Sequence, residues 1–429
     1  MDAARPRGTK MIRASKPNTA ASVASDDEGG RRARRFRKPF TQQEPLPEAA
    51  VARAVEVMRS GRLHRYNTLP GQPGEAAELE QAFAQYMQLP YCLACTSCGY
   101  ALHIALRSAG VSAGDPVLCN AYTLSPVPGA IDNAGGKPVF VETCEDCTVD
   151  VADLRRAALE SQARYFVLSH MRGHIADMDA IVALCRELGI VLIEDCAHTM
   201  GARWRGRLSG SFGDIACFST QTYKHMNSGE GGLLVCADPA YMRRAVLYSG
   251  SYMFYDRHPQ APPPETFVQD RLTVPNYSGR MDNLRAAVLL AQLPLLDANC
   301  RRWNALYQVL ESGLARIPGI AVIERPAHEA FVGSSIQFRL TECPGAKIPE
   351  FVRACAERGV VVKWFGAEQP EGYTSRYDSW RYVTSCRPLP RTTALLAGLC
   401  DIRIPLTFDT SDCELITELI GEALGSIAG

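Results

Sequence analysis

The chain contains no apolar run that is long enough to cross a lipid bilayer. The longest run, AAVLLAQLPLL at residues 286–296, falls well short of the roughly 20 residues that a membrane-spanning helix needs, so we expect a buried helix there. No apolar segment follows the basic cluster near the N-terminus, and we therefore expect no secretory signal. These absences favour a cytoplasmic protein without membrane segments.

The sequence of 429 residues also lacks net charge, with 46 Lys and Arg against 46 Asp and Glu, but the charges are unevenly distributed. Residues 1–39 hold 11 basic and 4 acidic residues and almost no large apolar ones, so we predict a disordered basic tail over residues 1–40. Its cluster RRARRFRK could contact nucleic acid or another acidic surface. A solvated extension is the simpler interpretation, because the rest of the chain shows no module that reads DNA.

Two groups among the 16 cysteines have spacings that occur in metal sites. These are Cys92-x2-Cys95-x2-Cys98 and Cys144-x2-Cys147, which zinc or an iron–sulfur cluster could occupy. However, LPYCLACTS has the pattern of a β-strand, in which Cys92 and Cys95 would point to opposite faces. We therefore expect no metal, and we interpret the cysteines as reduced thiols that pack as small apolar side chains.

Short apolar runs alternate with helical patterns in the first part of the chain. The expected strands are residues 90–96, 115–120, 137–142, 163–170, 189–195, 214–219 and 232–238. This alternation predicts an α/β fold with a mostly parallel sheet that is covered by helices on both faces. Ligands of such sheets bind beyond the carboxyl ends of the strands.

The C-terminal part has a different pattern. A long helical segment at residues 283–316 precedes shorter expected strands (IAVIE, SIQFRL and GVVVKWF) and a terminal helix. We therefore predict a large domain over residues 41–295 and a smaller C-terminal α/β domain over residues 296–429. The proline-rich stretch at residues 256–276 has no periodicity and could be either a functional lid or a surface insertion.

The most informative stretch runs from residue 194 to residue 232. Asp195 ends the apolar run GIVLIED, and Ser219 ends a second run, DIACFS. Lys224, the only lysine between residues 138 and 346, follows shortly after. A lysine that attacks a carbonyl and an acid that keeps a ring nitrogen protonated are the groups that pyridoxal phosphate (PLP) needs from a protein. Considered singly, Asp195 could be a helix N-cap, Ser219 a loop serine and Lys224 a surface residue.

Two further segments could support the same ligand. TSCGYALHIAL at residues 96–106 places small residues at an expected helix start, where free N–H groups and the helix dipole favour phosphate. SGEGG at residues 228–232 allows a close approach of the backbone. The order and spacing of all these elements make PLP the predicted cofactor.

A series of motifs extends from about residue 55 onward. They are RSGRLHRYN, TSCGYALHIALRSAGVSAGDPVL, GGKPVFVE, SHMRGHIADMDAI, IEDCAHTMGA, GSFGDIACFS, the lysine followed by GEGG, and GRMDNLRAAVLLAQL. In these motifs the chain resembles the DegT/DnrJ/EryC1/StrS family of fold-type I, PLP-dependent aminotransferases. The resemblance implies transfer of an amino group from glutamate or glutamine to a keto or aldehyde acceptor, such as a keto-sugar or a cyclitol. It also implies a homodimer with its active site at the subunit interface.

The resemblance assigns roles to four residues of the central stretch. Lys224 is similar to the lysine that binds PLP covalently and moves a proton between substrate and cofactor. Asp195 is similar to the acid that pairs with the ring nitrogen, and His198 stands where the family has Gln or His beside the 3′-oxygen of the cofactor. Ser219 matches the phosphate-binding serine.

Other positions depart from the family pattern. Cys98 and Gly99 stand where a Gly-Thr pair normally holds the phosphate through its backbone, and Thr220 replaces an aromatic residue. These departures favour a substrate outside the ordinary nucleotide-sugar set.

Two roles have no single obvious candidate. The aromatic residue that should stack on the cofactor ring falls near Leu124, with Tyr122 and Thr123 beside it, and we take Tyr122 as the candidate for cofactor binding. Asn276 or Arg280 could complete the site of a neighbouring subunit, and of the two we take Asn276 as the cofactor-binding candidate.

Two alternative functions stay open. The first is a PLP-dependent lyase, dehydratase or oxidase on the same scaffold. Sugar dehydratases of the family carry His where Lys224 stands, so the lysine argues against that branch, although His225 is adjacent. The second is a non-catalytic regulator that binds PLP or a sugar and contacts nucleic acid through its basic tail.

Overall fold

Seven strands form the central sheet of the structure, a computed structural model that describes residues 34–384 and 386–427. Their order across the sheet is β1 (Tyr91–Cys95), β9 (Gly232–Cys236), β8 (Ile215–Ser219), β5 (Val191–Asp195), β4 (Tyr165–Ser169), β2 (Pro116–Asn120) and β3 (Lys137–Val141). Neighbouring strands from β8 to β3 are parallel, whereas β9 is antiparallel to both of its neighbours. The predicted α/β fold with a mostly parallel sheet is therefore confirmed.

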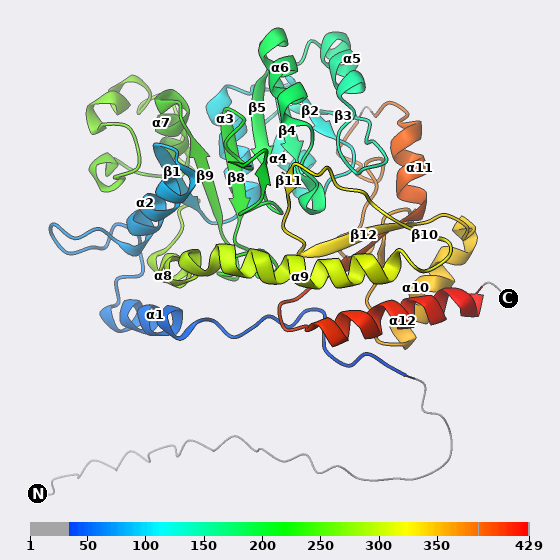
Figure 1. Cartoon of the computed structure of the whole chain (residues 1–429). Coiled ribbons are helices and arrows are strands. Elements are labelled where there is room, and N and C mark those ends of the chain that lie inside the picture. Colours follow the sequence, from blue (N-terminus) through cyan, green and yellow to red (C-terminus); the bar gives the residue numbers. More distant parts are fainter. Residues whose placement is uncertain (1–33, 385, 428–429) are drawn as a thin grey trace, which may run out of the picture. The chain divides into compact units, whose positions relative to one another are not determined.

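Helices cover both faces of this sheet, as Figure 1 shows. The α-helices are α1 (Glu48–Ser60), α2 (Glu75–Met87), α3 (Cys98–Ala109), α4 (Pro126–Asn133), α5 (Val151–Ser161), α6 (Met178–Leu188), α7 (Pro239–Tyr248), α8 (Asn283–Gln292), α9 (Leu296–Leu314), α10 (Ile348–Glu357), α11 (Pro390–Gly398) and α12 (Thr410–Ile427). Short 3-10 helices are η1 (Met171–Gly173), η2 (Tyr255–Arg257), η3 (Pro264–Gln269), η4 (Leu293–Leu295) and η5 (Gly345–Lys347).

Successive strand residues point alternately to two separate apolar cores. Leu192 packs in the core that α2, α5, α6 and α8 cover, and Ile193 packs in the core beneath α3, α4 and α7. Cys92 lies in the first of these cores, whereas Cys95 and Cys98 lie in the second. These three thiols therefore do not converge on a common point.

A second, antiparallel sheet is built from C-terminal residues. Its order is β10 (Ile320–Val322), β12 (Ser335–Leu340), β14 (Leu399–Arg403) and β13 (Lys363–Trp364). A small third sheet contains β11 (Glu329–Ala330), β6 (Arg203–Trp204) and β7 (Arg207–Leu208). Helices α9 and α12 pack side by side beside the C-terminal sheet (Figure 1). The domain boundary between residues 295 and 296 stays a prediction.

The long helical segment expected at residues 283–316 is divided into two helices. Helix α8 ends at Gln292, η4 follows, and α9 begins at Leu296. Pro294 lies in η4 and lacks the N–H that a continuous helix would use, which explains the interruption. None of the described helices combines the length and the apolar character needed to cross a bilayer.

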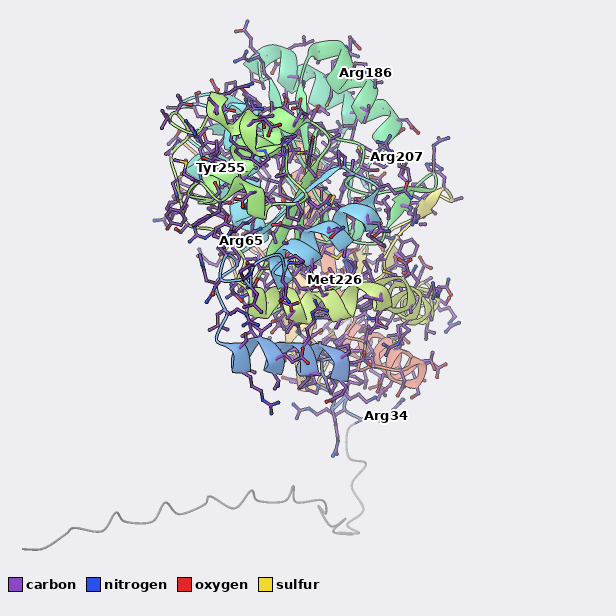
Figure 2. The ribbon with its side chains drawn as sticks, turned by 90° about the vertical axis from the view of Figure 1, so that its left-hand side faces the viewer. Arg34, Arg65, Arg186, Arg207, Met226 and Tyr255 are labelled. Atoms are coloured by element: carbon purple, nitrogen blue, oxygen red, sulfur yellow. The ribbon has the colours of Figure 1, made fainter. Side chains whose placement is uncertain are left out.

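The proline-rich stretch at residues 256–276 covers an edge of the central sheet. The backbone N–H of Cys92 in the edge strand β1 donates a hydrogen bond of 3.1 Å to the carbonyl of Gln260. Phe267 is fully buried and stacks on Tyr255, with 4.2 Å between the ring centroids. Figure 2 labels Tyr255 on this side of the molecule, together with Arg65. The stretch thus shields the free edge of β1, which favours the surface insertion over the lid.

The predicted disordered tail, residues 1–40, falls mostly outside the described residues, but its last residues belong to the folded body. Phe36 and Phe40 are 3% and 5% exposed and form edge-to-face contacts with Phe408, each with 5.0 Å between ring centroids. Lys38 forms ion pairs with Asp409 and Asp412. The prediction of disorder was therefore wrong for residues 36–40. The surrounding basic residues suggested a solvated tail, whereas the apolar partner of the two phenylalanines, Phe408, lies far away in the sequence.

Replacing Phe40 with Ala should lower the free energy of unfolding by about 3 kcal/mol, because the change leaves a cavity beside two other rings. Chemical denaturation of the purified variant measures the effect. Leu272→Ala, at a side chain that is 85% exposed, is the matched control and should change stability little. Equal stability of both variants and the parent protein would show that residue 40 is not part of the core.

Candidate active site

Three neighbouring strands of the central sheet end at polar side chains. Strands β4, β5 and β8 end at Ser169, Asp195 and Ser219. Ser169 and Asp195 are paired in register, and the Ser169 hydroxyl donates a hydrogen bond of 2.8 Å to Oδ2 of Asp195. The N–H of Ala197 donates to Oδ1 at 3.1 Å. These bonds fix the orientation of the Asp195 carboxylate at the carboxyl edge of the sheet.

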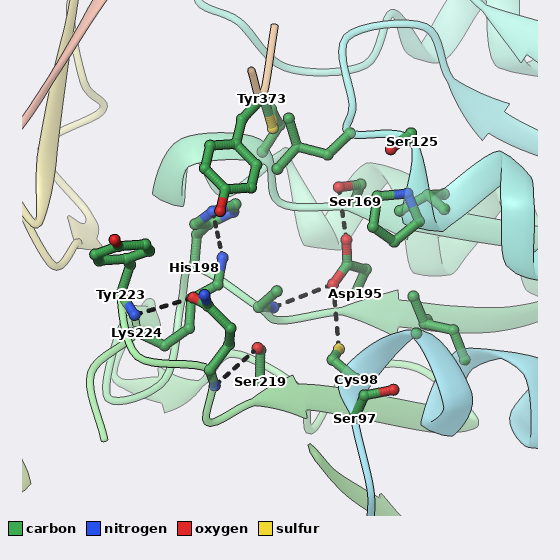
Figure 3. Close-up of a pocket in the computed structure, with 18 of the residues that line it drawn as sticks. Ser97, Cys98, Ser125, Ser169, Asp195, His198, Ser219, Tyr223, Lys224 and Tyr373 are labelled. Carbon is green, nitrogen blue, oxygen red and sulfur yellow. Dashed lines mark hydrogen bonds between the residues drawn. The ribbon is translucent and has the colours of Figure 1, made fainter. Parts of the chain in front are cut away.

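A cavity of about 400 Å³ opens at these strand ends (Figure 3). This volume lies within the range of about 300–1,000 Å³ that small-molecule sites occupy. The predicted site residues that line it are Lys224, Asp195, His198, Ser219, Cys98 and Gly99. The fold thus brings together residues that lie more than 100 positions apart in the sequence.

The N-terminus of α3 forms one wall of the cavity. Ser97 caps the helix by accepting a hydrogen bond of 3.1 Å from the N–H of Tyr100, and Cys98 and Gly99 form its first turn. Strand β9 passes so close that a Cβ atom at Gly232 would lie 2.5 Å from the carbonyl of Ser97. Only glycine fits there, which explains the end of the SGEGG motif. The helix start offers free N–H groups and a positive dipole end to an anion.

The amine of Lys224 lies against His198, with 2.7 Å between Nζ and Nε2. Part of the lysine side chain is accessible from the cavity, but burial, together with the positive charge of Arg172, lowers the pKa of Lys224 to about 7. Burial and the neighbouring Lys224 also hold the pKa of His198 well below its usual value. The imidazole is therefore neutral, and its Nε2 can accept a hydrogen bond from Nζ. A neutral amine near pH 7 is suited to attack a carbonyl or to accept a proton.

Similarity to a known protein family extends over most of the chain. Residues 47–409 match the DegT/DnrJ/EryC1/StrS aminotransferase family. The chain belongs to this family. The predicted family membership is thus confirmed, and the match covers both the central sheet and the C-terminal sheet.

The chain is also similar to individual proteins that carry different names. The chain is 34% identical over 286 residues to L-glutamine:2-deoxy-scyllo-inosose aminotransferase of Micromonospora echinospora, which covers 65% of the chain and 67% of that protein. It is 32% identical over 267 residues to Pleiotropic regulatory protein of Geobacillus stearothermophilus, which covers 61% of the chain and 64% of that protein. The chain therefore spans about two thirds of the length of these relatives. The crystal structure of an aminotransferase, TlmJ from Streptoalloteichus hindustanus, has the same fold, with a TM-score of 0.77 and 21% identity over 90% of this chain and 99% of that one.

Two predicted site residues of this family member lie outside the cavity. Tyr122 is 1% exposed and packs edge-on against Phe365, so it offers no free ring face to a ligand in the cavity. Leu124, two residues further along, lines the cavity instead. Asn276 is exposed and does not line the cavity of its own chain, so its role through a second subunit stays a prediction.

The sequence interpretation missed several residues that line the cavity. They are Ser169, Arg172, Tyr223, Tyr373 and Arg403. Ser169 is the next-to-last residue of the strand expected at residues 163–170, which precedes the one that ends at Asp195, so strand order could have identified it. Arg403 and Tyr373 come from the C-terminal part of the chain, where no local pattern marks them.

The low pKa of Lys224 predicts how the cofactor-free protein captures added PLP. The attachment rate should rise with pH up to about 7 and level off above it, because the neutral amine is the reactive form. Borohydride trapping at timed intervals measures the rate. The matched reference is N-acetyl-lysine, treated identically, because its ordinary amine should keep gaining reactivity toward pH 10.5. A protein profile that follows this reference would contradict the assignment.

Proposed function

We propose that the protein is a PLP-dependent aminotransferase that moves an amino group from glutamate or glutamine to a keto or aldehyde acceptor. The observation that carries the proposal is the Lys224 amine, whose pKa of about 7 leaves about half of it neutral at pH 7. It shares its cavity with Asp195 and the start of α3. Membership of an aminotransferase family supports the same function.

The residues of the cavity fit PLP. The first N–H groups of α3, at Cys98 and Gly99, and the hydroxyl of Ser219 would hold the phosphate. The close passage of Gly232 keeps this cradle free of a side chain. The Asp195 carboxylate would hold the proton on the pyridine nitrogen. When bound, PLP supplies an electron-withdrawing ring that stabilises negative charge on the substrate carbon.

The chain itself would supply the proton transfers. Lys224 accepts a proton at Nζ and returns it, which a pKa near 7 permits in both directions at neutral pH. His198 holds Nζ through its Nε2 and so limits where the amine can move. Ser169 keeps the Asp195 carboxylate turned toward the cavity.

His225, the neighbour of Lys224, does not serve as an alternative base in this arrangement. Its ring packs against Trp303, with 5.2 Å between centroids, and its Nε2 lies 3.1 Å from the hydroxyl of Ser334. Burial lowers the pKa of His225 to about 3, so it stays neutral. Lys224 lines the same cavity as Asp195, whereas His225 does not line it. This difference favours amine transfer over the dehydratase alternative.

The acceptor class, the assembly and the location are further parts of the proposal. The name of the Micromonospora echinospora relative, a glutamine-dependent aminotransferase of a cyclitol, supports glutamine as donor and a keto-sugar or cyclitol as acceptor. We also propose a cytoplasmic homodimer in which Asn276 reaches the site of the second subunit. The exposed position of Asn276 and the free thiols of all 16 cysteines support these two points.

Replacing Lys224 with Ala should abolish covalent attachment of PLP and amine transfer. The purified variant should lack the visible absorbance band and should give no borohydride-stable adduct by peptide mass spectrometry. Lys137→Ala, at an exposed lysine of β3, is the matched control and should keep both. An active Lys224→Ala protein with trappable cofactor would contradict the proposal.

A half-reaction distinguishes the aminotransferase from the alternatives. L-Glutamine or L-glutamate, added to the PLP-loaded protein without acceptor, should bleach the band once and release one equivalent of the corresponding oxo acid per site. A lyase or oxidase would not leave the amine on the cofactor, and a non-catalytic regulator would keep the band unchanged. Either outcome would overturn the assignment as an aminotransferase.

A further inference from the structure

Positive charge is concentrated on one side of the active-site cavity. Arg172 and Arg403 line the cavity, and Lys363 belongs to the same cluster. Arg172 follows β4 in η1, whereas Arg403 and Lys363 lie on β14 and β13 of the C-terminal sheet. The cluster therefore joins the central sheet to the C-terminal sheet at the site.

Arg172 has an unusual backbone conformation, and two of its guanidinium nitrogens are buried without a hydrogen-bond partner among the described residues. Its backbone angles of φ 55° and ψ 24° lie in the left-handed region, which non-glycine residues adopt mainly where the surrounding structure enforces it. The residue is only 7% exposed, yet Nε and Nη2 have no hydrogen-bond partner in the part of the chain that the structure describes. Nη2 lies 3.2 Å from Oδ2 of Asp401, close enough for an ion pair but not aligned for a hydrogen bond. A buried guanidinium with free donors beside a cavity is suited to bind an anion.

Asp401 is the one carboxylate that pairs with the cluster among the described residues. Its Oδ1 accepts a hydrogen bond of 2.7 Å from the amide of Gln337, and its Oδ2 lies 3.6 Å from Nζ of Lys363. Asp401 and Arg403 are two positions apart in β14, so their side chains lie on the same face of the sheet. Burial lowers the pKa of Lys363 to about 8, which still leaves it largely cationic at neutral pH. One carboxylate therefore faces three cations.

The other acids of the cavity do not balance this charge. Asp195 is already engaged by Ser169 and the N–H of Ala197, and Glu230 is exposed. Uncompensated charge in a partly desolvated site is unfavourable and is relieved by an anion. The cavity thus has two regions that attract anions, the start of α3 and this cluster.

Two aromatic rings lie beside the cationic cluster. The guanidinium of Arg403 lies 3.7 Å from the ring centroid of Tyr223, and Nζ of Lys363 lies 5.7 Å from that of Tyr373. Figure 3 shows both tyrosines on the side of the cavity away from Cys98. The cluster is therefore separate from the wall that would hold the cofactor phosphate.

We propose that Arg172 and Arg403, with Lys363 behind them, bind a carboxylate group of the small-molecule substrate. The inference rests on the proposed function, because the proposed function places the reacting end of that substrate beside Lys224. Guanidinium groups match the planar, two-oxygen geometry of a carboxylate. A substrate without such a group leaves Asp401 as the one carboxylate that pairs with the cluster among the described residues, and it binds less well.

Calorimetric titration of the PLP-loaded protein with succinate, a dicarboxylate that cannot donate or accept an amine, tests the subsite. Succinamide is the uncharged probe of the same length. The wild-type protein should bind succinate and should bind succinamide at least about tenfold more weakly, because charge-assisted hydrogen bonds contribute on that scale. Covalent attachment of PLP is confirmed first, so that failure of the proposed function is recognised independently.

Two variants and one control locate the binding. Arg403→Met and Arg172→Gln should each raise the dissociation constant for succinate about tenfold or more, and Arg403→Lys should restore part of the affinity of Arg403→Met. Arg339→Met, at an arginine of β12 that does not line the cavity, should leave it unchanged. Retention of the visible PLP band and of the thermal midpoint shows that the variants are folded.

Two results would overturn the inference. One is an unchanged succinate constant in both cavity variants. The other is a loss of PLP affinity in Arg403→Met that equals its loss of succinate affinity, because the cluster would then hold the cofactor phosphate.

The source of the carboxylate is resolved by the donor half-reaction of Arg403→Met. If the carboxylate belongs to the donor, the L-glutamate concentration for half-maximal bleaching should rise about tenfold while the limiting rate changes less. If it belongs to the acceptor, the donor half-reaction should be unchanged, and the amine form of the variant should still lose succinate affinity.

Discussion

The enclosure of the Lys224 amine is the constraint on which the rest of the site depends. An ammonium group loses hydration when it is enclosed, so its neutral form gains population near pH 7. That state is useful only if the amine is held in place, and neutral His198 does so through a hydrogen bond to Nζ. The parallel pairing of β4, β5 and β8 then sets Ser169, Asp195 and Ser219 around the same cavity. The chemistry of one lysine thus relies on strand register as well as on local burial.

Much of this arrangement could be predicted from the sequence because it depends on local patterns. Each strand of the central sheet is a short apolar run, and Asp195 and Ser219 each stand at the end of one. In a parallel sheet those ends meet at one edge, so two distant residues can be placed together without knowledge of packing. The start of α3 was recognisable for the same reason, since small residues before a helical pattern expose N–H groups.

The remaining features depend on contacts between distant segments. Tyr122 looked suitable as an aromatic partner of a ligand, but its ring is buried against Phe365 from the C-terminal part of the chain. Phe36 and Phe40 sit in a basic context that resembles a disordered tail, and only Phe408 makes them part of a core. Arg403 has no local signal at all, because the C-terminal sheet brings it to the cavity. Sequence patterns specify which face a residue occupies, but not which distant element covers that face.

The cationic cluster and the lysine are also linked electrostatically. Arg172 lowers the pKa of Lys224, so its charge helps to keep the amine neutral while the cavity holds no substrate anion. A carboxylate bound to Arg172 would offset that field and make protonation of Nζ more favourable. The same binding event that positions a substrate would therefore prepare Lys224 to accept a proton. Arg172 has a strained backbone, and its Nε and Nη2 have no hydrogen-bond partner among the described residues. It would in this way serve both recognition and proton transfer, which gives a physical reason for its placement at the junction of the two sheets.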